Sequence, residues 1–329
     1  MKLFRLLIVF TAAIALQSCG GDSTVSKANN KIDPTLRAII KEKNDSLLDA
    51  LSNSNNKALL RLASPEFTDD MYRKLDKVIW PFRKGQLTME YTVFDEYHNK
   101  HASFPKNEDM ESKDHSYTFK FTNKHAETYV SLLRFTSNVA DNYLLTIMYA
   151  RIGKEFKIIH TDLGGLGLYE KTAHDYYTMA KDAKEKGFML DAITYMNTAA
   201  SLSDPSGTML VYDEAEKIPQ YVKLWKPQVD RDFKLPTLLE NVKTKPSVID
   251  ISTAKNNDEI SQVFMYTTKI PITDTISLRK EYEEIRVEVK KLFPGINFNK
   301  RYMYYRAYNG KPASREDVAF YGFTDKKAK

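Results

Sequence analysis

Two side chains near the middle of the chain have the types and the spacing of an acid–base pair. His160 and Asp162 lie two residues apart in the β-rich run 158–162. Because successive side chains of a strand point to opposite faces, both would lie on one face. An imidazole and a carboxylate that face a cavity together can exchange protons with a ligand. The alternative is a structural or surface contact between two polar side chains, which needs no cavity.

A second candidate is an aromatic strand face late in the sequence. Tyr302, Tyr304, Arg306 and Tyr308 alternate along residues 301–308, so they would share one face. Aromatic rings with an arginine among them can bind sugar rings, peptides or single-stranded nucleic acid. Tyrosine is also favoured in strands because its ring covers a sheet well. If this face binds a partner, we expect a glycan or a peptide before nucleic acid.

Three further patterns carry little chemistry. His98 and His101 follow Asp95 and Glu96, all possible metal ligands, but the local pattern is a strand that runs into a loop. We therefore expect a solvated loop there and no metal site. The glycines of 164–167 lack the spacing of a phosphate loop and predict a tight connection. Neither G-x-S-x-G nor H-E-x-x-H occurs, so no catalytic residue and no cofactor is predicted.

The single cysteine, Cys19, closes a short basic and then apolar start. The apolar run 6–16 has the length of a signal-peptide core and is too short to span a bilayer. The sequence LQSC that ends at Cys19 resembles the lipobox of bacterial lipoproteins. That resemblance implies removal of residues 1–18 and attachment of lipid to Cys19. The alternative is an ordinary secretory signal.

The lipobox resemblance also implies a location. The chain would be held in the cell envelope by its lipid, and Gly20 after the cysteine favours the outer membrane, with the side of that membrane left open. A lipidated Cys19 leaves no thiol for a disulfide or a thiolate site. The net charge of +6 falls to +4 when Lys2 and Arg5 leave with the signal, a weak bias that does not indicate nucleic acid as a partner.

The first large segment predicts an α+β fold. Asp33 and Pro34 form a helix start, an Asn- and Ser-rich break follows, and two more helical stretches lead to Pro81. From Leu87 the apolar period changes to two. The expected strands cover residues 87–97, 116–122, 128–136, 143–152 and 156–162, with a hairpin turn at Gly153. Helices followed by curved hairpins resemble the nuclear transport factor 2-like cone fold.

The second half predicts a helical hairpin and another α+β unit. Tyr176, Ala180, Ala192 and Ala199 recur around Gly187 in an order that resembles one tetratricopeptide repeat. A single repeat favours a hairpin docked on a neighbouring domain. Residues 226–246 predict a linker, because they are rich in Pro and Lys. Strands are expected at 248–252, 260–268, 301–308 and 318–323, with a helix that carries the apolar stripe Leu278, Tyr282, Ile285, Val289 and Leu292.

These patterns together predict a lipid-anchored envelope protein of class α+β. The expected segments are a signal peptide at 1–18, a flexible tether at 19–33, a cone-like domain at 34–165, a helical hairpin region at 166–235 and a C-terminal α+β domain at 246–329. We expect a binding or scaffold module with a protein partner or a small ligand. The alternatives are an enzyme or carrier that uses the cone cavity at His160 and Asp162, and a glycan-binding surface lipoprotein.

Overall fold

The computed structural model describes residues 24–68, 71–137, 141–256, 259–312 and 319–327. Cys19 therefore lies outside the described residues. The chain forms two compact units. Unit 1 holds the chain up to Thr136 together with Tyr143–Gly164 and Ser206–Leu210. Unit 2 holds Ser137–Asn142, Gly165–Pro205 and the chain from Val211 onward. The class is mixed α+β, as predicted.

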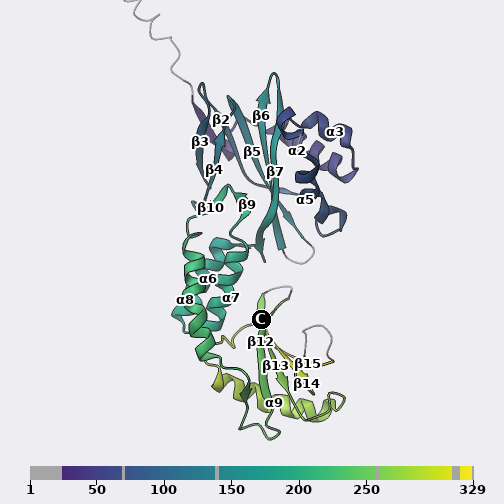
Figure 1. Cartoon of the computed structure of the whole chain (residues 1–329), viewed down its shortest axis with the longest axis vertical. Helices are drawn as coiled ribbons and strands as arrows, with labels where there is room; N and C mark the ends of the chain where they lie inside the picture. Colours follow the sequence, from purple (N-terminus) through teal and green to yellow (C-terminus); the bar gives the residue numbers. More distant parts are fainter. Residues whose placement is uncertain (1–23, 69–70, 138–140, 257–258, 313–318, 328–329) are drawn as a thin grey trace, which may run out of the picture. The chain divides into compact units, whose positions relative to one another are not determined.

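Unit 1 is built on a curled antiparallel sheet (Figure 1). Its strands are ordered β1 (Val25–Ala28), β2 (Thr92–Lys100), β5 (Glu127–Thr136), β6 (Asp141–Ile152) and β7 (Glu155–Leu168). Gly153 has φ +62° in the β6–β7 turn, which confirms the predicted hairpin. The last residues of β7 belong to unit 2, where Gly167 and Leu168 pair with β8 (Lys171–Thr172). A smaller sheet has the order β10 (Leu210–Tyr212), β4 (Tyr117–Asn123) and β3 (Lys106–Glu111), and β9 covers Pro205–Thr208.

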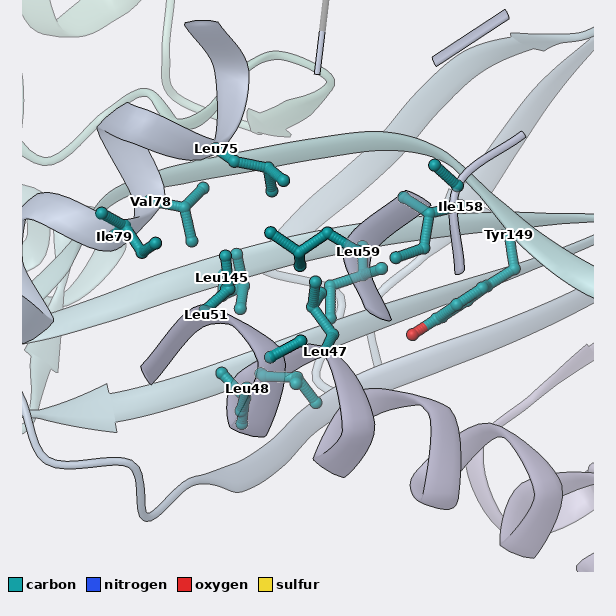
Figure 2. Close-up of a cluster of buried hydrophobic side chains, with 14 of the residues drawn as sticks. Leu47, Leu48, Leu51, Leu59, Leu75, Val78, Ile79, Leu145, Tyr149 and Ile158 are labelled. Atoms are coloured by element: carbon teal, nitrogen blue, oxygen red, sulfur yellow. The ribbon is translucent and has the colours of Figure 1, made fainter. Parts of the chain in front are cut away.

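Helices cover one face of the curled sheet. They are α2 (Pro34–Ser52), α3 (Asn56–Leu62), α4 (Pro65–Thr68) and α5 (Met71–Arg83), preceded by the short 3-10 helix η1 (Asn29–Lys31). The Asp33 carboxylate accepts hydrogen bonds from the backbone N–H groups of Thr35 and Leu36, which confirms the predicted start of α2. Figure 2 shows leucines of α2 and α3 packed with α5 against the strand residues Leu145, Tyr149 and Ile158. Full burial of each such side chain contributes about 1.5–3 kcal/mol to folding.

Three helices of unit 2 follow β8. They are α6 (Ala173–Glu185), α7 (Met189–Ser201) and α8 (Lys217–Asp232), and α6 and α7 lie side by side (Figure 1). Gly187 between them has φ +81°, a conformation that favours glycine. Ala180, Ala192 and Ala199 are fully buried, which lets the two helices approach closely. The predicted pair of helices is therefore present.

The rest of unit 2 is a five-stranded sheet with one long helix on one face. The strand order is β11 (Thr237–Leu238), β12 (Ser247–Lys255), β13 (Ile260–Thr267), β14 (Tyr302–Tyr308) and β15 (Tyr321–Lys326). Helix α9 (Thr275–Leu292) connects β13 to β14, and these two strands are parallel. Its predicted stripe packs on the sheet through the buried side chains Leu278, Tyr282, Ile285 and Val289.

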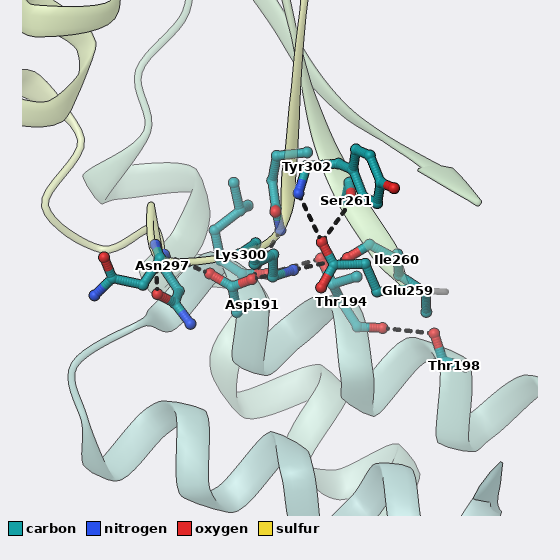
Figure 3. Close-up of polar contacts among 12 residues, drawn as sticks. Asp191, Thr194, Thr198, Glu259, Ile260, Ser261, Asn297, Lys300 and Tyr302 are labelled. Atoms are coloured by element: carbon teal, nitrogen blue, oxygen red, sulfur yellow. Dashed lines mark hydrogen bonds and ion pairs between the residues drawn. The ribbon is translucent and has the colours of Figure 1, made fainter. Parts of the chain in front are cut away.

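A buried polar network joins α7 to this sheet (Figure 3). Lys300 Nζ lies 2.5 Å from Asp191 Oδ1 and donates to the carbonyl of Ile260 at 2.9 Å. Asp191 also accepts from Gln262 Nε2 at 3.0 Å and from the backbone N–H of Asn297 at 2.8 Å. Because both charges are buried and each has several partners, this network fixes α7 against the sheet. Helices α6, α7 and α8 belong to the same compact unit as the sheet.

Several sequence expectations differ from this fold. The flexible tether expected at 19–33 is wrong from Val25 on, because β1 pairs with β2. The linker expected at 226–246 is also wrong. Helix α8 continues to Asp232, and Leu239 and Val242 are buried in the core of unit 2. The glycines of 164–167 form no separate connection, since they continue β7.

Among the described residues, no helix is both long enough and apolar enough to cross a membrane.

Candidate ligand-binding site

The candidate site lies in unit 1 and is centred on a buried carboxyl group. Asp95 is on β2, beside a register shift between Val93 and Asp95 in the pairing of β2 with β5. Such a bulge changes the direction of a side chain and is common beside functional sites. Asp95 is only 4% exposed, and it accepts a hydrogen bond from Asn29 Nδ2 at 2.7 Å and a short one from the Tyr117 hydroxyl.

Burial raises the pKa of Asp95 above its ordinary value of 3.8, and the hydrogen bonds from Tyr117 and Asn29 oppose that rise. Both of these donors are neutral. A buried carboxylate is stabilised best by a positively charged partner, and these donors supply none. The arrangement therefore favours a ligand that brings an ammonium or similar cation to Asp95.

Asn29 holds the site together from the other side. It follows β1 with φ +53°, in the left-handed region that Asn tolerates better than most residues. Its side chain bridges two neighbours on β2, since Nδ2 donates to Asp95 and Oδ1 accepts from the backbone N–H of Glu96 at 3.0 Å. The unusual backbone conformation thus has a clear use, which is to orient the carboxyl group.

Glu96 is the neighbouring buried acid, and it already has a cationic partner. Its carboxylate forms a short ion pair with Arg37 of α2 and accepts from the Tyr129 hydroxyl at 2.6 Å. Burial raises the pKa of Tyr129, and the hydrogen bond to Glu96 adds to the rise. The phenol therefore stays protonated and remains a donor. Asp95 and Glu96 are adjacent in sequence. Glu96 has a direct ion pair with Arg37, whereas the positive charge of Lys113 acts on Asp95 only at longer range, and the pKa of Asp95 remains raised.

A cluster of aromatic side chains on β2 and β4 includes Tyr117, which donates to Asp95. The Phe94 and Tyr117 rings are stacked, with centroids 5.8 Å apart, and Tyr117 is buried. The hydroxyls of Tyr117 and Tyr97 are 3.5 Å apart, and Tyr97 donates weakly to the carbonyl of Glu111 at 3.4 Å. Burial also raises the pKa of Tyr97 and Tyr117. These phenols position the carboxyl group and carry no charge at neutral pH.

A cavity of about 570 Å³ opens in front of this group. It lies between η1, the start of α2, the start of β2 and the turn from β3 to β4. Its ionisable lining residues are of both signs: Lys31, Arg37, Asp95, Glu111, Lys113 and His115. This cavity volume is within the usual range of small-molecule binding pockets in proteins. A cavity with a buried acid and several basic groups suits a zwitterionic ligand, which has a cation at one end and an anion at the other.

The predicted pair His160 and Asp162 lies elsewhere in unit 1. Both residues are on β7 and half-buried. Neither lines the Asp95 cavity. Asp162 Oδ2 lies 3.7 Å from the position that a Cβ atom on Gly207 would take, so its carboxylate faces the chain segment that returns to unit 1. The structure does not bring this pair to the candidate site, and its role stays a prediction.

The aromatic face of β14 is present in unit 2 but differs in one member. Tyr302 and Tyr304 are half-buried, and their rings are stacked at 6.3 Å with an angle of 5°. Arg301 and Lys326 lie over the Tyr302 ring, and Arg306 lies over Phe320. Tyr308, in contrast, is buried with Val263 and Met265. It belongs to a small core, so three of the four predicted residues remain accessible to a partner.

The two histidines near Asp95 have separate partners. His98 on β2 contacts Glu127 at 3.0 Å, whereas His101 forms a short buried pair with Glu108. The solvated loop expected here is wrong, since His98 is within a strand and His101 is 4% exposed. Within the part of the chain that the structure describes, no group of three or more His, Cys, Asp or Glu side chains is arranged to hold a metal ion.

Comparison with known proteins finds no match to any protein-family model, to any curated protein or to any solved structure.

Proposed function

We propose that this chain is a lipid-anchored bacterial envelope protein that binds a small zwitterionic ligand in the Asp95 cavity. Its cone-like unit 1 acts as the binding module, and its tetratricopeptide-like helices with the C-terminal sheet act as a scaffold. The observation that supports ligand binding most strongly is the buried Asp95 carboxyl group, which has two neutral donors and a cavity of about 570 Å³ in front of it. No step of catalysis is assigned to it.

The proposed lipid anchor would place this cavity near the membrane. Asn29 follows Cys19 by ten residues, and an extended chain of that length reaches about 35 Å. A cavity lined by Asn29 would then lie close to the bilayer. A lipid on Cys19 is proposed from the lipobox resemblance. Its test is metabolic labelling with an alkyne-bearing palmitate, where Cys19→Ser should lose the label and leave the membrane fraction. Equal labelling of both proteins would overturn the anchor.

Calorimetric titration of the full chain tests the ligand class. The probes are O-phosphoethanolamine, which carries both charges, and ethanolamine and inorganic phosphate, which each carry one. The proposal expects heat of binding for the zwitterion, and weaker or no binding for either half alone. Asp95→Asn should bind the zwitterion more weakly than the wild type does. The matched control for this variant is Asp109→Asn, because Asp109 is exposed on β3 and does not line the cavity. Equal affinity for phosphate and for the zwitterion would exclude a role for Asp95 in recognition.

The stacked pair of Tyr302 and Tyr304 supports a second candidate function, glycan binding by unit 2. The two rings, with the cationic side chains of Arg301 and Lys326 over Tyr302, form an aromatic and cationic surface of the kind that packs against sugar rings. Glycan-array binding by the wild-type chain and by Tyr304→Ala tests this candidate. Phe104→Ala, an exposed aromatic residue of unit 1, is the control. A glycan that binds both variants equally well would not use this face.

A further inference from the structure

The edge of the unit 2 sheet that is formed by β11 and β12 is open for most of its length. The two residues of β11 pair only with Ser247 and Val248 of β12. Beyond that point, no described strand pairs with the outer edge of β12, and residues 251–255 form its open part. Every second residue of an edge strand directs its N–H and C=O groups away from the sheet. These groups are a template for one more strand.

Helix α7 forms a wall beside this open edge. Leu190, Thr194, Asn197 and Ser201 repeat at helical spacing and line a groove with residues 251–253 of β12. The groove has a volume of about 420 Å³. From Leu190 to Ser201 the helix rises about 16 Å, which is the length of about five extended residues. The length of the helix wall and the length of the open edge therefore match.

The groove is fixed in shape before any partner binds. The buried pair of Asp191 and Lys300 holds α7 against the sheet, and Lys300 also donates to the carbonyl of Ile260, a residue that lines the groove (Figure 3). Thr194 and Thr198 donate to carbonyls within their own helix, so their hydroxyls have defined positions. A rigid groove costs little conformational entropy on binding.

The charge of the groove points to one kind of occupant. Its lining is neutral except for Lys255 at the end of β12. The Lys255 side chain is 61% exposed, and its Nζ lies 3.3 Å from the carboxylate of Asp141 in the same unit. An exposed pair of this kind contributes little, so a ligand carboxylate can compete for the lysine.

We propose that this groove binds an extended segment of a partner protein, which adds a strand to β12 and places a carboxylate at Lys255. Main-chain hydrogen bonds would supply much of the affinity, and the neutral α7 wall would select small or hydroxyl-bearing side chains. The proposal does not depend on the Asp95 cavity, because all groups that carry it belong to unit 2.

A displayed library of random octapeptides, selected on the full chain, provides the probe. The selected peptide is synthesised with its carboxylate and with the matching amide, and its affinity is measured by fluorescence anisotropy. Asn197→Arg places a long side chain in the groove and should weaken binding by about tenfold or more, which corresponds to about 1.4 kcal/mol. Ala200→Arg is the matched control, since Ala200 is exposed on the same helix and does not line the groove.

Two further measurements separate the possible results. Lys255→Met or the amide peptide should weaken binding by up to about fivefold. Hydrogen exchange should show new protection for backbone amides of residues 251–255. If no peptide is enriched, or if Asn197→Arg binds the peptide as well as Ala200→Arg does, the proposal is wrong. Protection of the same amides that depends on protein concentration, without peptide, would identify a second copy as the occupant and would also overturn it.

Discussion

Lys300 Nζ lies 2.5 Å from Asp191 Oδ1, and both side chains are almost completely buried. This pair joins a helix and a loop that are far apart in sequence, and it is the main polar contact that holds α7 on the unit 2 sheet. The removal of one charge leaves the other buried without compensation. We therefore predict that Asp191→Asn destabilises the protein by about 3–5 kcal/mol, measured by urea denaturation.

A double variant and an exposed pair are the controls for this prediction. Asp191→Asn combined with Lys300→Met removes both charges and should recover part of the lost stability. Asp230→Asn breaks the exposed pair of Lys226 and Asp230 on α8 and should cost at most about 1 kcal/mol. If the loss for Asp191→Asn is no larger than that for Asp230→Asn, the buried pair does not hold α7.

The buried Asp95 predicts a particular dependence of stability on pH. Since burial raises its pKa in the folded state, its contribution is fully present below the unfolded pKa near 3.8 and is lost as pH rises through the folded value. Asp95→Asn cannot ionise, so relative to the wild type it should gain stability as pH rises from 3 to 7. Urea denaturation of both proteins across this range measures the difference. A difference that does not change with pH would contradict the raised pKa.

For Glu127 we predict the opposite dependence of stability on pH. Burial alone would raise its pKa, but hydrogen bonds from Arg151 and His98 outweigh burial and lower it below 4.5. Its contribution is therefore present above pH 4.5 and is lost as pH falls through the lower folded value. Glu127→Gln should cost about 1.5–3 kcal/mol at pH 7 and much less at pH 3, as measured by urea denaturation. An equal cost at both pH values would argue against this assignment.

Two glycines near the turn from β7 to β8 should respond differently to substitution by alanine. A Cβ atom on Gly167 would lie 2.5 Å from the backbone oxygen of Lys171, whereas a Cβ on Gly165 would meet a Leu202 side chain at an ordinary 3.7 Å. Gly167→Ala should therefore lower the free energy of unfolding by about 1–3 kcal/mol, and Gly165→Ala should change it much less. Thermal denaturation of both variants measures this. The reverse order would show that the turn relaxes freely.

Local patterns made much of the fold predictable. Asp33 with Pro34 marked the start of α2, Gly153 marked a hairpin turn, and the apolar stripe from Leu278 marked α9; each signal lies within one element. Strand β3 was missed, because its sequence KNEDME has few strand-forming residues. It is a strand since it pairs along its length with β4, which places Glu108 and Met110 inward.

The candidate site was not predictable in the same way. Asn29 and Asp95 are 66 residues apart in sequence, and nothing in the local pattern indicates that they touch. One signal was available, which is the pair of acids Asp95 and Glu96 inside a strand pattern where apolar residues are expected. The residues that follow, however, have the pattern of a strand that runs into a loop, and this pattern predicts a solvated loop. Asp191 was missed for a similar reason, because its partners at 262, 297 and 300 come together only in the folded unit.

The most direct test of the proposed function is the affinity of the full chain for O-phosphoethanolamine, measured by calorimetry for the wild type, Asp95→Asn and Asp109→Asn. A hydrogen bond to a charged group contributes about 1.5–3 kcal/mol, so Asp95→Asn should bind at least about tenfold more weakly than the wild type. Asp109→Asn should bind as the wild type does. No binding to the wild type, or equal binding to all three proteins, would contradict the account.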